Sequence, residues 1–144
     1  MTPKQRVGLG GENAATSYAI AHGMRILYRN WRYGSLELDI ICEDIDGVIF
    51  VEVKTRKAQS MTSPLEGITA KKCSSLRKAA RIWLANHANY YDKPCRFAVA
   101  AVSYVEQPIL TYKVMWYDNA FDFSYTGNGA YSTVGGCNSS WQPW

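Results

Sequence analysis

The feature that most restricts the fold is a pair of strand-like runs on either side of Asp46-Gly47. The runs SLELDIIC (35–42) and GVIFVEVK (47–54) are rich in β-branched and apolar residues, which is typical of β-strands. An Asp-Gly pair between such runs is a strong hairpin signal, because both residues tolerate the positive φ that a tight turn requires. The sequence therefore predicts a β-hairpin.

Helical spacing of apolar residues marks two further segments. The run 12–22 predicts a first helix, and the glycine-rich stretch 8–11 before it reads as a flexible approach. An apolar stripe predicts a second helix from about 69 to 88. A pattern similar to a capping box at 63–66 leaves an earlier start of this helix open.

Three more segments have strand character, namely 24–32, 96–105 and 111–116. The order helix, three strands, helix, two strands predicts an α/β fold with a mixed central sheet flanked by helices. The stretch 124–144 has no charged residue and is expected to be a loosely attached tail. Because 144 residues suffice for one core, a single domain is expected over 1–123.

Composition and charge narrow the classes of protein. Hydrophobic residues make up 47% of the chain and charged residues 19%, the balance of a soluble globular protein. No apolar run has the length of a membrane helix and the N-terminus lacks the apolar stretch of a secretion signal, so we expect a cytoplasmic protein without a membrane partner. The net charge of +4 weakly favours anionic partners such as nucleic acid.

Cysteine and histidine residues show no zinc spacing. The four cysteines are far apart in the sequence and are expected to be reduced, mostly buried thiols. His22 and His87 lie in the two expected helices without a second ligand at metal spacing, so we expect structural roles for both.

Charged residues of the predicted hairpin are expected to meet on one face. Side chains alternate along a strand, so Glu37 and Asp39 share a face of the first strand, and Glu52 and Lys54 share a face of the second. A two-residue turn would place Asp39 opposite Lys54, and a four-residue loop would place it opposite Glu52. Either register brings both carboxylates and the lysine onto one face.

This arrangement fits a metal site, but it also fits an ion pair. Asp39 and Glu52 are suited to hold Mg²⁺, which takes oxygen ligands, and the backbone carbonyl of Val53 is an additional candidate ligand. Lys54 would then orient or help to deprotonate a water molecule. The alternative is a cross-strand ion pair of Lys54 with either carboxylate on an exposed sheet face. Spacing alone leaves both interpretations open.

A family resemblance favours the metal site. The motifs that carry it are GLGGENAA (8–15), RNWR (29–32), ELDII (37–41) and FVEVKTR (50–56), together with Lys71, Arg96-Phe97 and 119–121. With these motifs the sequence resembles the YraN-type family of small, largely uncharacterised bacterial proteins. The fold of that family is similar to Holliday-junction resolvases and other PD-(D/E)xK nucleases. The resemblance covers residues 8–123.

The resemblance implies a restriction-endonuclease-like fold and metal-dependent hydrolysis of phosphodiester bonds with Mg²⁺ or Mn²⁺. Asp39 matches the motif aspartate, Glu52 and Lys54 match the ExK pair, and Glu12 matches a helix carboxylate that reaches the metal region. Glu37 also matches a family position. The expected catalytic residues are therefore Glu12, Asp39, Glu52 and Lys54, with Asp39, Glu52 and Val53 at the metal.

The partner implied by the resemblance is nucleic acid, with DNA as the expected substrate. Candidate phosphate contacts are Arg29, Arg32, Arg56, Lys71 and Lys72, of which Arg32 and Arg56 flank the site in sequence. A homodimer fits the resemblance to resolvases, since paired cuts need paired sites. Two alternatives stay open: a nucleic-acid-binding module of the same fold without turnover, and a structural protein.

Some positions fit the family less well or have ordinary roles. Ala98 stands where the family usually has Asp, and Leu36 stands where it usually has Gly. Trp31 is expected in the core, because an aromatic residue near a strand end is more often core than base-stacking. For the stretch 124–144 the resemblance supplies no counterpart.

Overall fold

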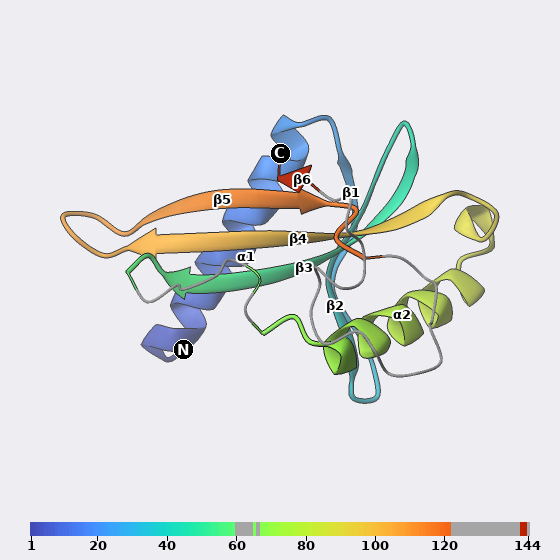
Figure 1. The fold of residues 1–144 in the computed structure, drawn as a ribbon, viewed down its shortest axis with the longest axis horizontal. Helices are drawn as coiled ribbons and strands as arrows, with labels where there is room; N and C mark the ends of the chain where they lie inside the picture. Colours follow the sequence, from blue (N-terminus) through green and yellow to red (C-terminus); the bar gives the residue numbers. More distant parts are fainter. Residues whose placement is uncertain (60–64, 66, 122–141, 144) are drawn as a thin grey trace.

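One mixed β-sheet with a helix on each face forms the described part of the chain (Figure 1). The structure is a computed structural model and describes residues 1–59, 65, 67–121 and 142–143. Its elements are α1 (Pro3–Ala21), β1 (Arg25–Tyr33), β2 (Leu36–Asp44), β3 (Gly47–Lys57), α2 (Ala70–Ala85), the 3-10 helix η1 (Ala88–Tyr90), β4 (Cys95–Val105), β5 (Thr111–Asp118) and β6 (Gln142–Pro143). The predicted α/β class is confirmed, and the architecture is consistent with a restriction-endonuclease-like fold.

The strand order in the sheet is β1-β2-β3-β4-β5-β6. β3 and β4 are parallel, and the other neighbouring strands are antiparallel. Parallel neighbours need a long connection, which here runs through α2 and η1. β3 pairs with β2 on one side and with β4 on the other, so it lies inside the sheet. Its apolar sequence is typical of such a buried strand.

The hairpin between β2 and β3 has a slightly different turn from the one expected. Asp44 pairs with Gly47, so the turn residues are Ile45 and Asp46 rather than Asp46 and Gly47. Asp44 Oδ1 accepts a hydrogen bond from the Asp46 N–H at 2.9 Å, and such Asx contacts favour turns. Gly47 takes the positive φ of 136° beside the carbonyl of Pro94. This register places Asp39 next to Glu52, the neighbour expected from the four-residue loop, although the observed turn has two residues.

α1 begins nine residues earlier than predicted. Thr2 caps the helix in a capping box with Gln5, and Pro3 occupies the first turn. The glycines that were read as a flexible approach therefore lie inside the helix. A Cβ on Gly10 would lie 2.0 Å from Tyr112 Oη, and one on Gly11 would lie 2.0 Å from Thr55 Oγ1. The prediction was wrong because Gly10 and Gly11 serve close packing against the sheet.

Gly11→Ala is expected to lower the free energy of unfolding by up to about 2 kcal/mol. Overpacking against Thr55 costs roughly 1 to 3 kcal/mol, and the better helix propensity of alanine offsets about 1 kcal/mol of it. Urea denaturation of Gly11→Ala, Thr55→Ala and the double variant measures the coupling between the two positions. If the double variant showed no relief relative to the sum of the single variants, the close contact would not be the reason for the glycine.

α2 begins at Ala70, with Thr69 as its N-cap. The earlier start lies largely outside the described residues, since 60–64 and 66 are not described. The predicted apolar stripe is confirmed and consists of the buried residues Cys73, Leu76, Ala79, Ala80, Trp83 and Leu84. His87 follows the helix end, where its ring stacks on Trp83 and its Nδ1 contacts the Trp83 carbonyl at 2.7 Å, a structural role as predicted.

Each face of the sheet has its own core. Val48 and Phe50 of β3 belong to the cluster that α2 covers, whereas Ile49 and Val51 belong to the cluster that α1 covers. Because side chains alternate, Glu52 and Lys54 continue the α2 face. Cys42 and Cys73 are buried and Cys95 is half-buried, and none of the three forms a disulfide; Cys137 lies outside the described residues.

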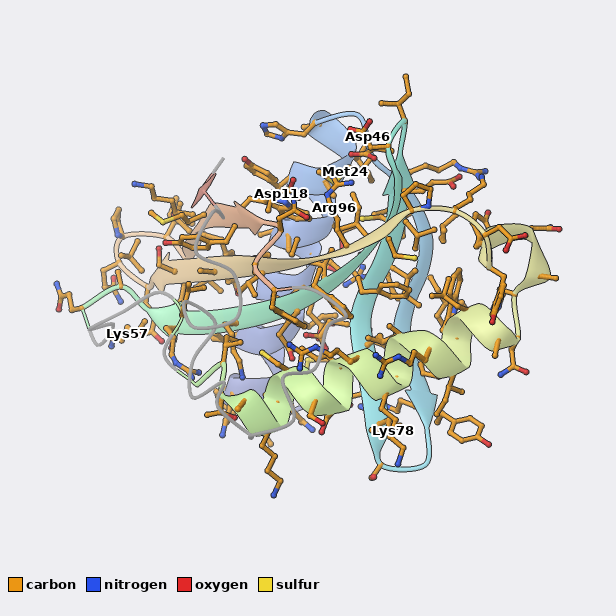
Figure 2. The ribbon with its side chains drawn as sticks, turned by 45° about the vertical axis from the view of Figure 1, so that its right-hand side comes forward. Met24, Asp46, Lys57, Lys78, Arg96 and Asp118 are labelled. Atoms are coloured by element: carbon orange, nitrogen blue, oxygen red, sulfur yellow. The ribbon has the colours of Figure 1, made fainter. Side chains whose placement is uncertain are left out.

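Next to the turn of the β2–β3 hairpin, Arg96 of β4 connects three strands. Its guanidinium donates to Asp44 Oδ2 at 2.7 Å and to Asp118 Oδ1 at 2.9 Å, and Figure 2 shows Arg96 and Asp118 together at this end of the sheet. The Arg96 hydrogen bonds lower the pKa of Asp44. This ion-pair network ties β2, β4 and β5 together.

Of the expected tail 124–144, the structure describes Gln142 and Pro143. Their backbone forms β6, which pairs with Asp118 and Tyr117 of β5. The rest of the tail lies outside the described residues, and its loose attachment stays a prediction. Within the described residues, neither helix is both long and apolar enough to cross a membrane.

Candidate functional site

The candidate site lies where β2 and β3 stop pairing. The last pair of the ladder is Ile40 with Val51, and the next residues along the two strands are Asp39 and Glu52. Asp39 Oδ2 accepts a hydrogen bond from the Val53 N–H at 2.8 Å, so a side chain satisfies a backbone donor beyond the end of the ladder. The aspartate is thereby held between the strands.

Asp39 and Glu52 form a carboxylate pair that shares a hydrogen bond. Glu52 is only 6% exposed, and Asp39 is partly buried. Burial, the hydrogen bond with Glu52 and the charge of Glu52 raise the pKa of Asp39 to about 8, although the Val53 N–H and Lys72 act in the opposite direction. With this raised pKa Asp39 is mainly protonated at neutral pH, because burial and a neighbouring carboxylate disfavour its charged form.

A lysine of α2 provides the nearest cation. Lys72 Nζ lies 3.1 Å from Glu52 Oε2. Burial alone would lower the pKa of Lys72, but the charge and hydrogen bond of Glu52, with the charge of Asp39, outweigh it and the pKa rises. Lys71, the α2 lysine preferred from sequence, is exposed. Helical spacing could have found Lys72, since it lies four residues before the buried Leu76.

Lys54 extends along the same face of β3 as Glu52. A Cβ built on Gly67 would lie 4.0 Å from Lys54 Nζ, so the ammonium group lies beside the backbone that leads into α2. Among the described residues no carboxylate forms an ion pair with Lys54, whereas Glu52 is buried and pairs with Lys72. The alternative of an exposed ion pair between Lys54 and Asp39 or Glu52 is therefore wrong.

Glu12 of α1 approaches the same region from the other face of the sheet. Burial raises its pKa, a hydrogen bond from Asn30 lowers it, and the charge of Asp39 raises it again. Arg29 Nη2 lies 3.7 Å from Glu12 Oε2. The Nε and Nη2 atoms of Arg29 are shielded from solvent and have no hydrogen-bond acceptor among the described residues. Glu12 and Arg29 thus add a third carboxylate and a cation to the surroundings of the pair.

The remaining candidate residues lie further out. Arg32 is exposed and pairs with Glu37 at 3.4 Å across β1 and β2. Arg56 is exposed at the end of β3. Together with Lys71, these side chains are accessible to a large anion, and their contacts with phosphate stay predictions. Trp31 packs against the core on the α2 side, as expected.

The two departures from the family pattern lie on different parts of the fold. Ala98 is fully buried in β4, in the core that α1 covers. Leu36 begins β2 and is partly buried against the core that α2 covers. Neither position contributes a side chain to the carboxylate pair.

The residues present fit a hard divalent cation. Mg²⁺ usually takes one or two carboxylates from a protein and keeps several waters, and the pair supplies two carboxylates in a setting where a cation would replace the proton of Asp39. Among the described residues, no group of three or more His, Cys, Asp or Glu side chains converges as a metal centre. A cation here would therefore be held by the pair itself, with Val53 as an expected carbonyl ligand.

Comparison with known proteins places this chain in a family. The model of the uncharacterised protein family UPF0102 matches residues 11–102. A UPF0102 protein of Nitratidesulfovibrio vulgaris (strain DP4) is 43% identical over 141 residues, which cover 98% of this chain and 97% of the relative. A UPF0102 protein of Lawsonia intracellularis is 36% identical, with 96% of each chain covered. One of Stutzerimonas stutzeri is 35% identical over 85% of this chain and 99% of the relative.

These relatives also correct one expectation. Because the similarity to the Nitratidesulfovibrio protein covers 98% of the chain, it extends into 124–144, the stretch for which the resemblance supplied no counterpart. The family match covers the carboxylate pair and the residues around it on α1, β3 and α2. By the family match and by the identity to relatives of nearly equal length, this chain is a member of uncharacterised protein family UPF0102.

Proposed function

We propose that this protein is a metal-dependent nuclease that hydrolyses phosphodiester bonds in nucleic acid, with DNA as the expected substrate. The observation that carries the proposal is the carboxylate pair at the end of the β2–β3 ladder. Burial and the charge of Glu52 raise the pKa of Asp39 to about 8, which is an unfavourable state for a purely structural carboxylate. Strongly shifted pKa values of this kind are frequent at functional sites.

Mg²⁺ or Mn²⁺ is the expected cofactor. Asp39 and Glu52 would hold it, together with the Val53 carbonyl. When bound, such a cation lowers the pKa of a coordinated water and stabilises negative charge on a phosphoryl oxygen. Mg²⁺ and Mn²⁺ both bind carboxylate and carbonyl oxygens, so the ligands of this site suit either ion.

The side chains around the pair have separable tasks in this proposal. Lys54, without a carboxylate partner among the described residues, would donate a hydrogen bond to the attacking water and orient it. Lys72, whose Nζ lies 3.1 Å from Glu52 Oε2, would offset the charge of that carboxylate. Arg29, whose side chain is 30% exposed beside Glu12, would bind a non-bridging phosphate oxygen, and Glu12 would hold a proton near the leaving group or water.

One observation favours a second function, a nucleic-acid-binding module without turnover. Lys72 already neutralises Glu52, and no third acidic ligand converges on the pair among the described residues. If the lysine permanently takes the place of the metal ion, the protein would still bind nucleic acid through its basic side chains but would not hydrolyse it. This alternative predicts salt-sensitive binding of nucleic acid that survives Asp39→Ala.

The test is metal binding followed by cleavage. Isothermal titration of Mg²⁺ and Mn²⁺ into wild type and the Asp39→Asn, Glu52→Gln double variant measures whether the pair is the metal site. Cleavage is then followed on labelled linear duplex, branched and single-stranded DNA. We expect the double variant to lose both metal binding and metal-dependent cleavage. Asp46→Asn removes a carboxylate from the exposed turn at the far end of the same hairpin (Figure 2) and should leave both unchanged.

Equal metal binding by wild type and the double variant, with no cleavage by either, would refute the nuclease proposal. Nucleic-acid binding that depends on salt, with metal binding absent from both proteins, would establish the binding module instead. No binding of nucleic acid at any salt concentration would leave a structural role.

A further inference from the structure

A groove lies between the first turns of α1 and the ends of β3 and β4. It has a volume of about 420 Å³, and its walls include Lys4, Gly8, Thr55, Arg56, Lys57 and Tyr104, with Glu106 at the rim. Figure 2 shows Lys57 at the free end of β3, at the edge of the molecule. A second hollow of about 220 Å³ shares Lys57, Tyr104 and Glu106 with the groove and extends it across the end of β4.

The charge of the groove selects an anion. Lys4 and Lys57 are cationic and Glu106 is anionic, whereas the Arg56 guanidinium lies on the α2 face, where a Cβ on Gly67 would be 3.4 Å from its Nη2. Glu106 Oε2 lies 3.7 Å from Lys57 Nζ, with both side chains more than half exposed, so a positive excess remains. The first turn of α1 contains no acidic residue, and the positive end of the helix dipole adds to this field.

Gly8 is the feature that tight packing does not explain. Glycine is unfavourable inside a helix, and Gly10 and Gly11 are accounted for by Tyr112 and Thr55, which a Cβ would strike. At Gly8 a Cβ would meet nothing within 4 Å, although Gly8 lines the groove. The missing side chain leaves the helix backbone open to whatever occupies the groove.

The face of α1 that lines the groove leads to Glu12, whose pKa is raised by burial and by the charge of Asp39. Lys4, Gly8 and Glu12 follow one another four residues apart on one face of α1, at about 6 Å per step. On the facing strand, Thr55 and Lys57 line the groove, and Lys57 lies five residues beyond Glu52, about 17 Å along β3. The line from Glu12 to Lys4 therefore spans about three to four nucleotides of a strand at 3.4 Å rise.

We infer that this groove binds the phosphate backbone of one nucleic acid strand and leads it to the carboxylate pair. The inference rests on the proposed function for its choice of nucleic acid as the anion. Lys4 and Lys57 neutralise backbone phosphates, and the open surface at Gly8 lets the strand approach the helix. These contacts carry no sequence information, so the groove positions the strand irrespective of base sequence.

Gly8→Glu tests the groove, and Ser17→Glu is its matched control. Both variants add one carboxylate to α1, and nine residues at 100° each place the exposed Ser17 on the opposite side of the helix. Gly8→Ala tests the fold: its melting temperature should equal or exceed that of wild type, because the added Cβ meets nothing and alanine favours the helix. Gly8→Glu should likewise fold.

Binding is measured by fluorescence anisotropy of labelled single-stranded and duplex DNA in EDTA, between about 50 and 200 mM KCl. We expect Gly8→Glu to weaken binding by about tenfold or more and to reduce the salt slope by about the equivalent of one phosphate contact. Ser17→Glu should weaken binding by no more than about threefold, the generic effect of one charge. Magnesium binding at the carboxylate pair should be unchanged in both variants.

Equal weakening by Gly8→Glu and Ser17→Glu, or no effect of either on a wild type that binds and cleaves DNA, would overturn the inference and leave the nuclease proposal intact. Selective loss of binding in Gly8→Glu without metal-dependent cleavage by wild type would support the groove and refute the nuclease proposal. A wild type that binds neither DNA probe would overturn both.

Discussion

Asp39→Asn is expected to abolish metal-dependent cleavage while it stabilises the metal-free protein. Loss of one of the two carboxylate ligands removes several kcal/mol of transition-state stabilisation, so activity should fall by about a thousandfold or more. The asparagine amide can still accept the Val53 N–H hydrogen bond and donate to Glu52, as a protonated Asp39 does. The fold should therefore keep its contacts.

The gain in stability follows from the pKa of Asp39. In the folded state the pKa is raised from 3.8 to about 8, so the folded state binds a proton that the unfolded chain releases. The contribution of Asp39 to the free energy of unfolding is then fully present below about pH 4 and is lost as the pH rises towards 8. Asparagine does not ionise, and in EDTA at pH 8 we expect Asp39→Asn to be more stable than wild type by on the order of 2 kcal/mol, discounted for the partial exposure of Asp39.

Urea denaturation in EDTA at several pH values between about 4 and 8 measures this effect. Asp44→Asn, on the same strand, is a control of opposite sign. The Arg96 hydrogen bonds lower the pKa of Asp44, so its contribution is present at neutral pH and is lost as the pH falls through that lowered value. Asp44→Asn should therefore destabilise the protein at pH 8. If Asp39→Asn destabilised it as well, the carboxylate pair would be structural.

Lys72→Met is expected to lower the free energy of unfolding by about 2 to 3 kcal/mol in the absence of metal. It leaves the buried Glu52 without the ammonium that lies 3.1 Å away, and removal of one partner from a buried ion pair is strongly destabilising. Methionine keeps the unbranched shape and helix propensity of lysine, so the charge is the main change. The Lys72→Met, Glu52→Gln double variant should regain most of the loss.

Magnesium should partly replace the missing lysine. A cation at the pair binds the folded state only, so it raises the melting temperature by mass action, and we expect this rise to be larger in Lys72→Met than in wild type. Lys71→Met, one residue earlier and exposed, is the matched control and should change neither stability nor the magnesium effect appreciably. An equal magnesium shift in all three proteins would mean that Lys72 and the metal do not share Glu52.

Sequence spacing could predict the position of Lys54 relative to Glu52, but it could not predict the contact between Glu52 and Lys72. Alternation along β2 and β3 is a local property, so the shared face of Glu52 and Lys54 followed from the order of residues alone. The partner of Glu52, Lys72, lies on α2, twenty residues further along the chain. No local sequence pattern connects these two positions. Lys72 carried a usable signal, its spacing from Leu76, but its contact with Glu52 depends on how α2 packs.

The sequence by itself determined the α/β class, the strand runs, the apolar stripe of α2 and the membership of Asp39, Glu52 and Lys54 in one hairpin, because side-chain periodicity and turn chemistry are local. Only the tertiary structure decided the start of α1, the pairing of Glu52 with Lys72 and the groove at Gly8. These features depend on distances between segments far apart in the chain. In the sequence alone the glycines look like helix breakers; the packing of α1 on the sheet shows that Gly10 and Gly11 allow close contact and that Gly8 leaves an open surface.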